Sequence, residues 1–224
     1  MYVGQVMHTE LVTTVEHTSL IKAKEMIEAH DINHLLVVDQ KGKLVGLVSD
    51  RDLKKHWASS ATTLAKNELN YVLDKITVDM IMSRQVKSVT PATTIERAAD
   101  FMQVHRISAL PVLRDSQLAG IITRTDVMRV LLDSIGLADD SSRLTILVAD
   151  RIGALAEITQ LLKNNQINIH SLICWPEKDH TGIFHVIIRV AAEYSQTAVK
   201  VLQEGGFSVL TEFVEDLSPY LPKT

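Results

Sequence analysis

Apolar side chains follow two different spacings along the chain, one typical of helices and one typical of strands. Residues 19–30 and 94–105 carry apolar side chains at helical spacing, whereas 35–38 and 44–48 are short β-branched runs. The turn between these two runs contains Gly42, which supplies the positive φ that a tight hairpin needs. The pattern therefore predicts an extended start, a helix, a two-stranded hairpin and a second helix.

This β-α-β-β-α pattern occurs twice. Met82 follows Met7 by 75 positions and Gly120 follows Gly46 by 74, so one residue is lost in the turn near Gly42. A single unit of this size has too little core to stand alone, because a lone hairpin is only marginally stable. We therefore expect the two repeats to pack together face to face.

The remaining third of the chain has a different order of elements. Strand and helix spacings alternate as β-α-β-β-α-β, which is the ferredoxin-like arrangement of an antiparallel sheet with two helices on one face. The elements are expected at 144–149, 154–163, 167–174, 184–190, 195–202 and 207–213. Leu155 is expected on the apolar, core-facing side of the first of these helices, and Phe213 on one face of the last strand. The whole chain is thus predicted to be of mixed α+β and α/β class.

A short polar stretch around Gly136 separates the repeats from this last region, as linkers between domains commonly do. The predicted domain organisation is a first repeat at 1–60, a connecting segment at 61–75, a second repeat at 76–134, a linker at 135–142, a third domain at 143–216 and a tail at 217–224.

The composition and charge of the chain indicate which classes of protein it can belong to. The net charge is −4 and no basic cluster is visible, which argues against nucleic-acid binding. Neither an export leader nor an apolar run of membrane-spanning length is present, so we expect no membrane and a cytoplasmic location. Cys174 is the single cysteine, which excludes an intrachain disulfide and is expected to be an inert, buried side chain.

The most distinctive motif is Ser/Thr-x-x-Asp, placed directly after a strand and before a helix in both repeats. Ser49 with Asp52, and Thr123 with Asp126, could each form a capping box that stabilises the first turn of the helix. The same spacing could instead hold a nucleotide, since helix-start amides attract phosphate and a carboxylate accepts ribose hydroxyls. The doubling of the motif favours the second interpretation.

Residues 3–130 resemble two CBS domains that form a Bateman module, since both copies carry Gly, two apolar residues and Ser/Thr-x-x-Asp. The resemblance implies an adenine nucleotide or another adenosyl compound as regulatory ligand, such as AMP, ADP or ATP, with no required cofactor. It implies that Asp52 and Asp126 bind ribose and that Ser49 and Thr123 approach phosphates.

By the same resemblance, the adenine pockets would be lined by Thr13 and Ser88 together with the backbone near His34–Leu36 and Ala109–Pro111. Leu36 stands where the second copy has Pro111, whose fixed φ would preorganise the backbone against a base. The sequence therefore favours the second cleft, around Asp126, over the first.

Residues 143–214 resemble an ACT domain, whose first loop often reads Asp-x-Pro-Gly-x-Leu; here it is Asp-Arg-Ile-Gly-Ala-Leu from Asp150 to Leu155. The resemblance implies a small amino-acid-like effector bound near Asp150, Gly153, Ala154 and Leu155. The alternative is that Gly153 only eases the turn from strand to helix.

No two of the nine histidines have metal-ligand spacing with a carboxylate nearby, and no catalytic motif is present, so we expect neither a metal site nor an enzyme.

The order CBS, CBS, ACT resembles the acetoin-utilisation family. That resemblance implies a regulatory protein of acetoin or central carbon metabolism whose partner is a metabolic enzyme. A homodimer or larger assembly is expected, because an open four-stranded sheet and a two-repeat CBS unit leave edges or apolar faces that need covering. The alternative is an assembly or regulatory subunit of an enzyme, with no ligand of its own.

Overall fold

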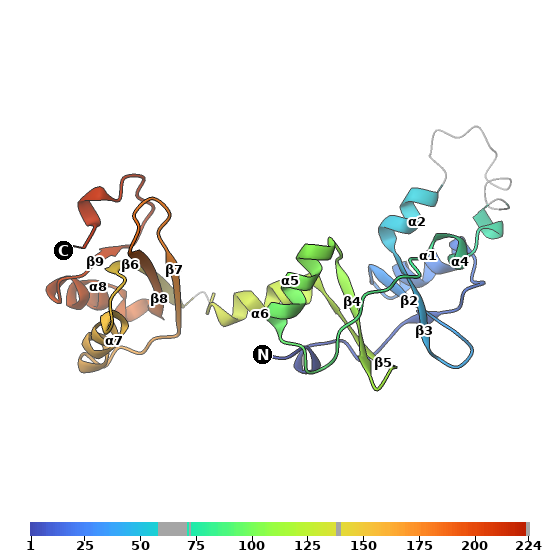
Figure 1. Ribbon diagram of the computed structural model, residues 1–224, viewed down its shortest axis with the longest axis horizontal. Coiled ribbons are helices and arrows are strands. Elements are labelled where there is room, and N and C mark those ends of the chain that lie inside the picture. The colour runs from blue at the N-terminus through green and yellow to red at the C-terminus, as the bar shows by residue number, and fades with distance from the viewer. Residues whose placement is uncertain (58–70, 72, 138–139, 223–224) are drawn as a thin grey trace. The chain divides into compact units, whose positions relative to one another are not determined.

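The computed structural model describes residues 1–57, 71, 73–137 and 140–222. The chain divides into two compact units, Met1–Met128 and Arg129–Thr224, each of which is described by itself (Figure 1). Most of the expected connecting segment at 61–75 lies outside the described residues, as do two residues of the expected linker and the last two of the tail. Among the described residues, no helix combines the length and the apolar character that a membrane crossing requires.

The first repeat has the predicted order of elements. Its strands are β1 (Thr13–Thr14), β2 (His34–Val38) and β3 (Leu44–Ser49), and its helices are α1 (Leu20–Ala29) and α2 (Asp50–His56). β1 pairs parallel to β2, and β2 pairs antiparallel to β3. The Ser19 hydroxyl caps α1 by accepting from the Lys22 amide. The hairpin turn contains Gly42 at φ +76°, as predicted.

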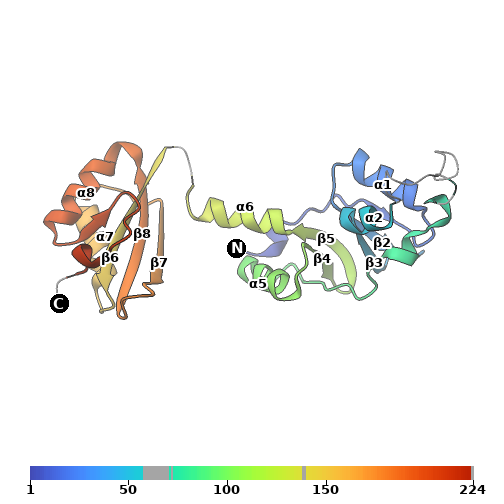
Figure 2. The same ribbon diagram turned by 90° about the horizontal axis from the view of Figure 1, so that it is seen from above.

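The second repeat follows the same plan with a shorter start. It consists of α4 (Val78–Ile81), α5 (Ile95–His105), β4 (Ala109–Arg114), β5 (Gln117–Thr123) and α6 (Arg124–Ser134). Its opening strand is reduced to a single parallel bridge between Val89 and Val112. Figure 2 shows α1 and α2 beside the hairpin β2–β3, and α5 beside the hairpin β4–β5.

Each repeat is completed by the segment that precedes the other one. The His8 amide donates to the Ile121 carbonyl (2.9 Å), and the Ile121 amide donates back to the His8 carbonyl (3.0 Å), which attaches the start of the chain to the second repeat. At the equivalent positions, Ser83 and Leu47 exchange the same two bonds (2.9 and 3.1 Å) across to the first repeat. The N-terminal turn η1 (Val3–Gln5) also lies on the second repeat, because the Val3 amide donates to the Thr93 carbonyl.

A methionine at the end of each exchanged segment packs directly on a glycine. A Cβ atom added at Gly46 would lie 2.3 Å from Sδ of Met82, and one added at Gly120 would lie 2.6 Å from Sδ of Met7. Real Cβ atoms do not approach so closely, so glycine leaves the space that each methionine fills. The repeated Met and Gly positions in the sequence are therefore one contact used twice.

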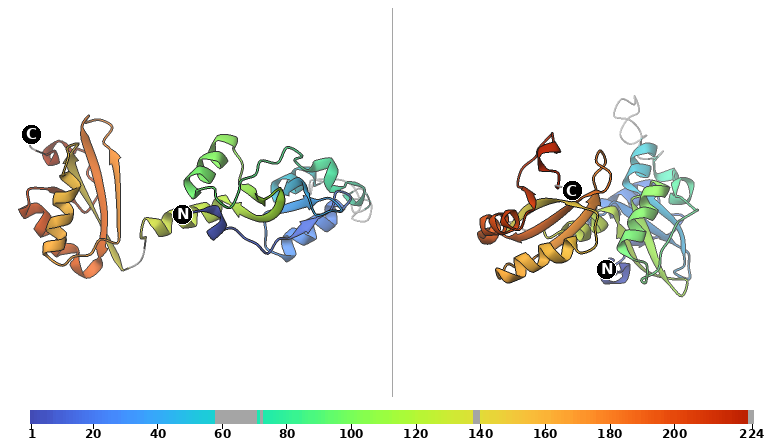
Figure 3. Two further views of the ribbon diagram at one scale, coloured as in Figure 1. Left: turned by 60° about the horizontal axis from the view of Figure 1, so that its bottom comes forward. Right: turned by 60° about the vertical axis from the view of Figure 1, so that its left-hand side comes forward.

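The second unit is the predicted βαββαβ domain. Its sheet has the order β7-β8-β6-β9, made from β6 (Ser141–Ala149), β7 (Ser171–Pro176), β8 (Ile183–Ala191) and β9 (Ser208–Leu210). Its helices are α7 (Ala154–Asn164) and α8 (Ser195–Glu204), with the short turns η2 (Ala192–Tyr194) and η3 (Ser218–Tyr220). Figure 3 shows α7 and α8 on the same side of this sheet.

The helix-covered face holds the core of this domain, including Ile146, Ile158, Ile188 and Leu202. Three expectations in this domain were wrong. The last strand ends at Leu210, and Phe213 beyond it is exposed. Leu155, expected on the buried face of α7, is exposed at the start of that helix.

The third wrong expectation concerns Cys174, which is exposed rather than buried. It lies on β7, which forms one edge of the sheet, so the helices do not cover it fully. Partial desolvation nevertheless raises the pKa of its thiol, which keeps the side chain protonated and inert near neutral pH.

The contact between glycine and methionine gives a first prediction. Gly46→Ala should lower the free energy of unfolding by about 1–3 kcal/mol, because the new methyl group overpacks against Met82. Met82→Ala should also be destabilising, but in the double variant the methyl group gains the vacated space. Chemical denaturation of the four proteins should therefore give a double-variant cost smaller than the sum of the single costs. Strict additivity would contradict the close contact.

Candidate functional site

The first repeat places its Ser-x-x-Asp motif where β3 turns into α2. One carboxylate oxygen of Asp52, Oδ2, accepts from the Ser49 amide (2.9 Å) and hydroxyl (2.6 Å), and the Asp52 amide donates to the Ser49 hydroxyl (3.3 Å). The capping box is therefore formed. The other oxygen, Oδ1, accepts no hydrogen bond from the residues that the structure describes.

The second repeat builds the same turn between β5 and α6. Oδ2 of Asp126 accepts from the Thr123 amide (2.9 Å) and hydroxyl (2.7 Å), while Oδ1 lies 2.9 Å from Nε2 of His8. Asp126 is 5% exposed. Burial acts most strongly on the pKa of Asp126 and would raise it, but the hydrogen bonds from Thr123 and His8 outweigh burial, so the pKa is lowered.

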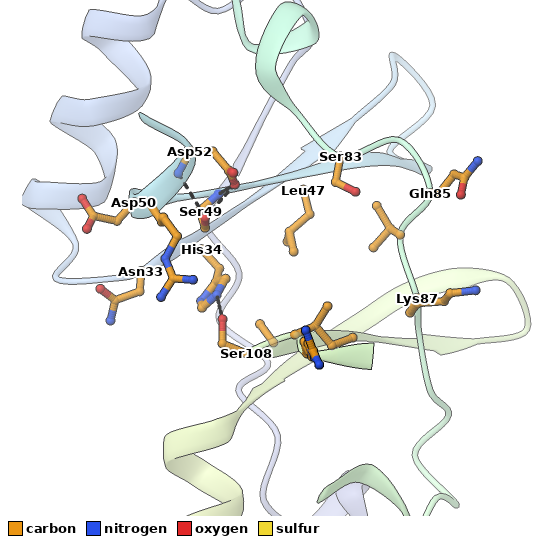
Figure 4. A pocket seen from close by; sticks show the side chains of 15 residues that line it. Asn33, His34, Leu47, Ser49, Asp50, Asp52, Ser83, Gln85, Lys87 and Ser108 are labelled. Carbon is orange, nitrogen blue, oxygen red and sulfur yellow. Dashed lines mark hydrogen bonds between the residues drawn. The ribbon is translucent and has the colours of Figure 1, made fainter. Parts of the chain in front are cut away.

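Each aspartate faces a cleft between the two repeats. The first cleft, around Asp52, has a volume of about 450 Å³. One wall comes from the first repeat and includes Ser49 and Asp52, and the other comes from the second repeat (Figure 4). The second-repeat residues that line it are Ser83, Gln85, Val86, Lys87, Arg106, Ile107, Ser108 and Ala109.

The second cleft, around Asp126, has a volume of about 560 Å³ and is composed in the reciprocal way. Thr123 and Asp126 come from the second repeat. The opposite wall is drawn from the start of the chain and the first repeat: His8, Glu10, Leu11, Val12, Asp31, Ile32, Asn33, His34 and Leu36. Both volumes are in the range of pockets that enclose small-molecule ligands.

The two clefts share part of a wall. Asn33, His34 and Ser108 line both of them, and Nε2 of His34 lies 2.8 Å from the hydroxyl oxygen of Ser108. This hydrogen bond joins the two repeats and is visible at the centre of Figure 4. Burial lowers the pKa of His34, and the negative charge of Asp52 opposes this only partly. His34 is therefore neutral at pH 7.

The structure places several predicted site residues differently from the expectation. Ser49, Asp52, Thr123, Asp126, His34 and Ala109 line the clefts. Thr13, Ser88 and Pro111 do not line either cleft. In place of Thr13 and Ser88, their chain neighbours Val12 and Lys87 line the clefts.

The preference for the second cleft rested on placing the Pro111 segment beside Asp126. The structure contradicts that placement, because Ala109 lines the cleft of Asp52 and Leu36 lines the cleft of Asp126. The clefts are built from both repeats, so each copy's hairpin contributes to the opposite motif. Lining residues such as His8, Asp31 and Arg106 were missed for this reason. Asp31 and Arg106 stand at matching positions of the two repeats. Once each hairpin is known to face the opposite motif, this match indicates both of them as lining residues.

The ACT-like domain has a cavity of about 340 Å³ at the start of α7. All four residues expected to bind an effector line it: Asp150, Gly153, Ala154 and Leu155. Gly153 precedes the helix with φ +93°, a conformation that favours glycine. The rest of the lining is mostly apolar and includes Phe184, Val186 and Cys174. Arg151 beside it is paired with Glu157.

Within the described part of the chain, no group of three His, Cys, Asp or Glu side chains could hold a metal ion.

Comparison with known proteins identifies the two regions. Residues 3–59 and 78–133 match the CBS domain, and residues 142–202 match the ACT domain. The chain belongs to the CBS domain family. It carries a tandem CBS pair followed by a C-terminal ACT domain.

Three relatives illustrate the range of this family. A CBS domain-containing protein of Dictyostelium discoideum is 32% identical over 58% of this chain and 90% of its own length. A homoserine O-acetyltransferase of Methanohalobium evestigatum is 31% identical over 58% of this chain but 24% of the enzyme, so the chain spans about a quarter of that relative. A solved structure from Vibrio cholerae, whose name assigns it to acetoin utilization (AcuB), is 31% identical over 61% of this chain and 94% of its own, with a TM-score of 0.50.

The shared wall gives a second prediction. Because folding lowers the pKa of His34, the folded state favours the neutral ring, and this contribution to stability is complete above the unfolded pKa of about 6.5. It is lost as the pH falls from there through the lowered pKa of the folded state. The His34→Gln variant keeps a hydrogen-bonding group beside Ser108 but has no titratable ring at this position. This pH-dependent loss of stability therefore cannot occur in it.

Denaturation of both proteins between about pH 7.5 and 5 checks this, since the difference isolates His34 from the other histidines. The stability of the wild type relative to His34→Gln should decrease as the pH falls. A difference that stays constant would contradict the burial of a neutral ring.

Proposed function

We propose that the chain is a non-catalytic, ligand-sensing regulatory protein that binds adenosyl compounds in the two clefts between its CBS repeats. One observation carries the proposal: a carboxylate from each Ser/Thr-x-x-Asp motif faces a cleft large enough for a nucleotide. A carboxylate is the natural acceptor for the two hydroxyls of a ribose. The resemblance to CBS pairs supports the adenosyl group as the ligand.

The capping box does not argue against this role. In both repeats the box occupies Oδ2 alone. Oδ1 of Asp52 has no donor among the described residues, and Oδ1 of Asp126 faces His8, whose side chain is about half exposed and able to yield to a ligand. The motif can therefore begin its helix and bind a ribose at the same time.

A ligand in either cleft would contact both repeats, which supports a regulatory rather than a storage role. Because the walls of each cleft come from different repeats, a bound ligand favours the arrangement in which those walls are correctly spaced. Regulation requires only that this arrangement engages a partner differently from the unliganded one. The partner, by this proposal, is a metabolic enzyme.

The finer parts of the proposal rest on the domain order. We infer that a small amino-acid-like effector occupies the cavity at Asp150 and Gly153, since the lining combines a glycine turn with a helix start. We infer a role in acetoin or central carbon metabolism in the cytoplasm, and the likeness to the Vibrio cholerae protein supports the acetoin part of this inference.

A second candidate is an assembly or regulatory subunit that has no ligand of its own. The homoserine O-acetyltransferase supports it, because the region like this chain is 24% of a larger enzyme. The ligand-binding variants below distinguish the two candidates.

Replacing either cleft aspartate by alanine should weaken adenosyl binding in that cleft. A charge-assisted hydrogen bond contributes about 1.5–3 kcal/mol, so Asp52→Ala and Asp126→Ala should each lower the affinity of their own cleft roughly 10- to 150-fold. Isothermal titration calorimetry of the full chain with adenosine nucleotides measures the effect.

Both variants also lose part of a capping box, so a matched control is needed. Ser19→Ala removes the cap of α1 outside the clefts and should cost a similar ~1 kcal/mol of stability without changing affinity. If folded Asp52→Ala and Asp126→Ala both bound nucleotide with wild-type affinity, the aspartates would be helix caps only and the ribose role would be wrong.

We also propose that the chain assembles as a homodimer or larger. β7 is an edge strand of the ACT sheet, and its exposed Leu172 and Trp175 lie at that edge. Edges with apolar side chains are commonly covered in proteins. Light scattering at micromolar concentration should give at least twice the mass of one chain. A single-chain mass, with or without ligand, would refute the assembly.

A further inference from the structure

The two clefts have the same plan but different charges. Matching the two repeats by sequence pairs all but one lining residue of each cleft with a lining residue of the other. The pairs that differ in charge are Gln85 with Glu10, Lys87 with Val12, Arg106 with Asp31, Asp50 with Arg124 and Arg51 with Thr125.

The cleft of Asp52 carries three cationic side chains, Arg51, Lys87 and Arg106, and two carboxylates, Asp50 and Asp52. None of the three cations forms an ion pair with a described carboxylate. Asp50 is already paired with Lys54 at 2.5 Å. The first cleft is therefore net positive.

The cleft of Asp126 has the opposite balance. Its lining contains three carboxylates, Glu10, Asp31 and Asp126, against one cation. That cation, Arg124, donates to the Ile107 carbonyl (2.8 Å). Neither Glu10 nor Asp31 forms an ion pair with a described cation. With neutral histidines, the two clefts differ by three unit charges.

Arg106 and Asp31 are the clearest of these pairs. Both follow the helix that precedes the hairpin, and both adopt left-handed backbone, with φ 53° and 50°. The chain thus places a guanidinium and a carboxylate at the same point of two otherwise similar clefts. The hydroxyl residue and the aspartate of the Ser/Thr-x-x-Asp turn are common to both clefts and cancel from the comparison. The residues that differ in charge therefore decide which ligand each cleft prefers.

We propose that the two clefts prefer different adenosyl ligands according to the charge of the ligand, an inference that rests on the proposed adenosyl-binding function. The cleft of Asp52 takes a phosphorylated adenosine. The cleft of Asp126 takes an adenosyl group without phosphate, and favours one with a positive charge such as a sulfonium.

The size of the effect follows from Coulomb's law. Two unit charges about 6 Å apart, in the high dielectric of a partly open cleft, change an affinity by about 3- to 10-fold. A phosphate monoester carries nearly two charges. Four of the five differing pairs make the first cleft the more positive one, Asp50 with Arg124 acts the other way, and the net difference is three unit charges. Clefts lined by one sign of charge also concentrate ligands of the other sign.

The first experiment is calorimetry of the full chain with three probes: AMP, 5′-methylthioadenosine and S-adenosylmethionine. The cleft for each probe is assigned with Asp52→Ala and Asp126→Ala. AMP should bind roughly 10- to 150-fold more weakly in Asp52→Ala, and the two unphosphorylated probes should weaken similarly in Asp126→Ala. Raising the salt concentration should weaken AMP and S-adenosylmethionine, but not the uncharged probe.

The second experiment exchanges the charges at the matched pair. Arg106→Asp should weaken AMP in the first cleft about 3- to 10-fold or more, and leave 5′-methylthioadenosine unchanged. Asp31→Arg should strengthen AMP in the second cleft by a similar factor and weaken S-adenosylmethionine. Each replacement residue already occupies the equivalent position of the other repeat, so the backbone accepts it. Lys178→Glu, an exposed change in the ACT domain, controls for net charge alone.

The outcomes separate this inference from the function on which it rests. If all three probes bind but the charge variants leave their preferences unchanged, or if AMP binds the cleft of Asp126, the division by charge is overturned and the adenosyl-binding function remains. If no probe binds either cleft, both are overturned. Exchange of preferences in the Arg106→Asp, Asp31→Arg double variant supports both.

Discussion

The first unit depends on a close contact between a methionine and a glycine that is made twice. Met82 packs on Gly46 of the first repeat, and Met7 packs on Gly120 of the second. Each glycine opens a space on its hairpin that only a side chain from beyond the repeat fills, and the backbone pairs formed beside it hold that segment in place. A repeat without this segment would expose the space and an unpaired strand edge, both of which are costly. Because the segment for each repeat precedes the other, neither repeat is complete alone. The two clefts are formed between repeats for the same reason.

This exchange determines how the two clefts can differ. In a pair of self-contained domains, a change in one repeat would alter one site. Here a change in the first hairpin or its preceding helix alters the cleft of the second motif, as Asp31 and Leu36 illustrate. The motif itself can remain the same in both repeats, because it starts a helix as well as facing a cleft. Most of the charge difference between the clefts lies on the wall opposite the motif, and the two residues between Ser/Thr and Asp differ as well.

Much of the fold could be predicted from the sequence, because its signals are local. The helices around Ala23 and Ala98, the hairpin at Gly42 and the βαββαβ order each follow from periodicity and turn chemistry over a few residues. The Ser/Thr-x-x-Asp motifs were found in the same way. What could not be predicted depends on contacts between distant segments. His8 reaches Asp126 across 118 positions, and no local pattern indicates it. The exposure of Cys174 and Leu155 likewise depends on how far the helices extend over the sheet edge.

The attachment of residues 1–8 to the second repeat has a consequence for the second cleft. The Ile95 amide donates to the Met1 carbonyl, and His8 lies beside Asp126, so these eight residues are structurally part of the second repeat. Their removal would take His8 from the lining of that cleft and uncover Gly120, whereas Leu47 and Ser83 would keep their two bonds on the first repeat. A deletion early in the sequence would thus damage the cleft whose motif is encoded much later.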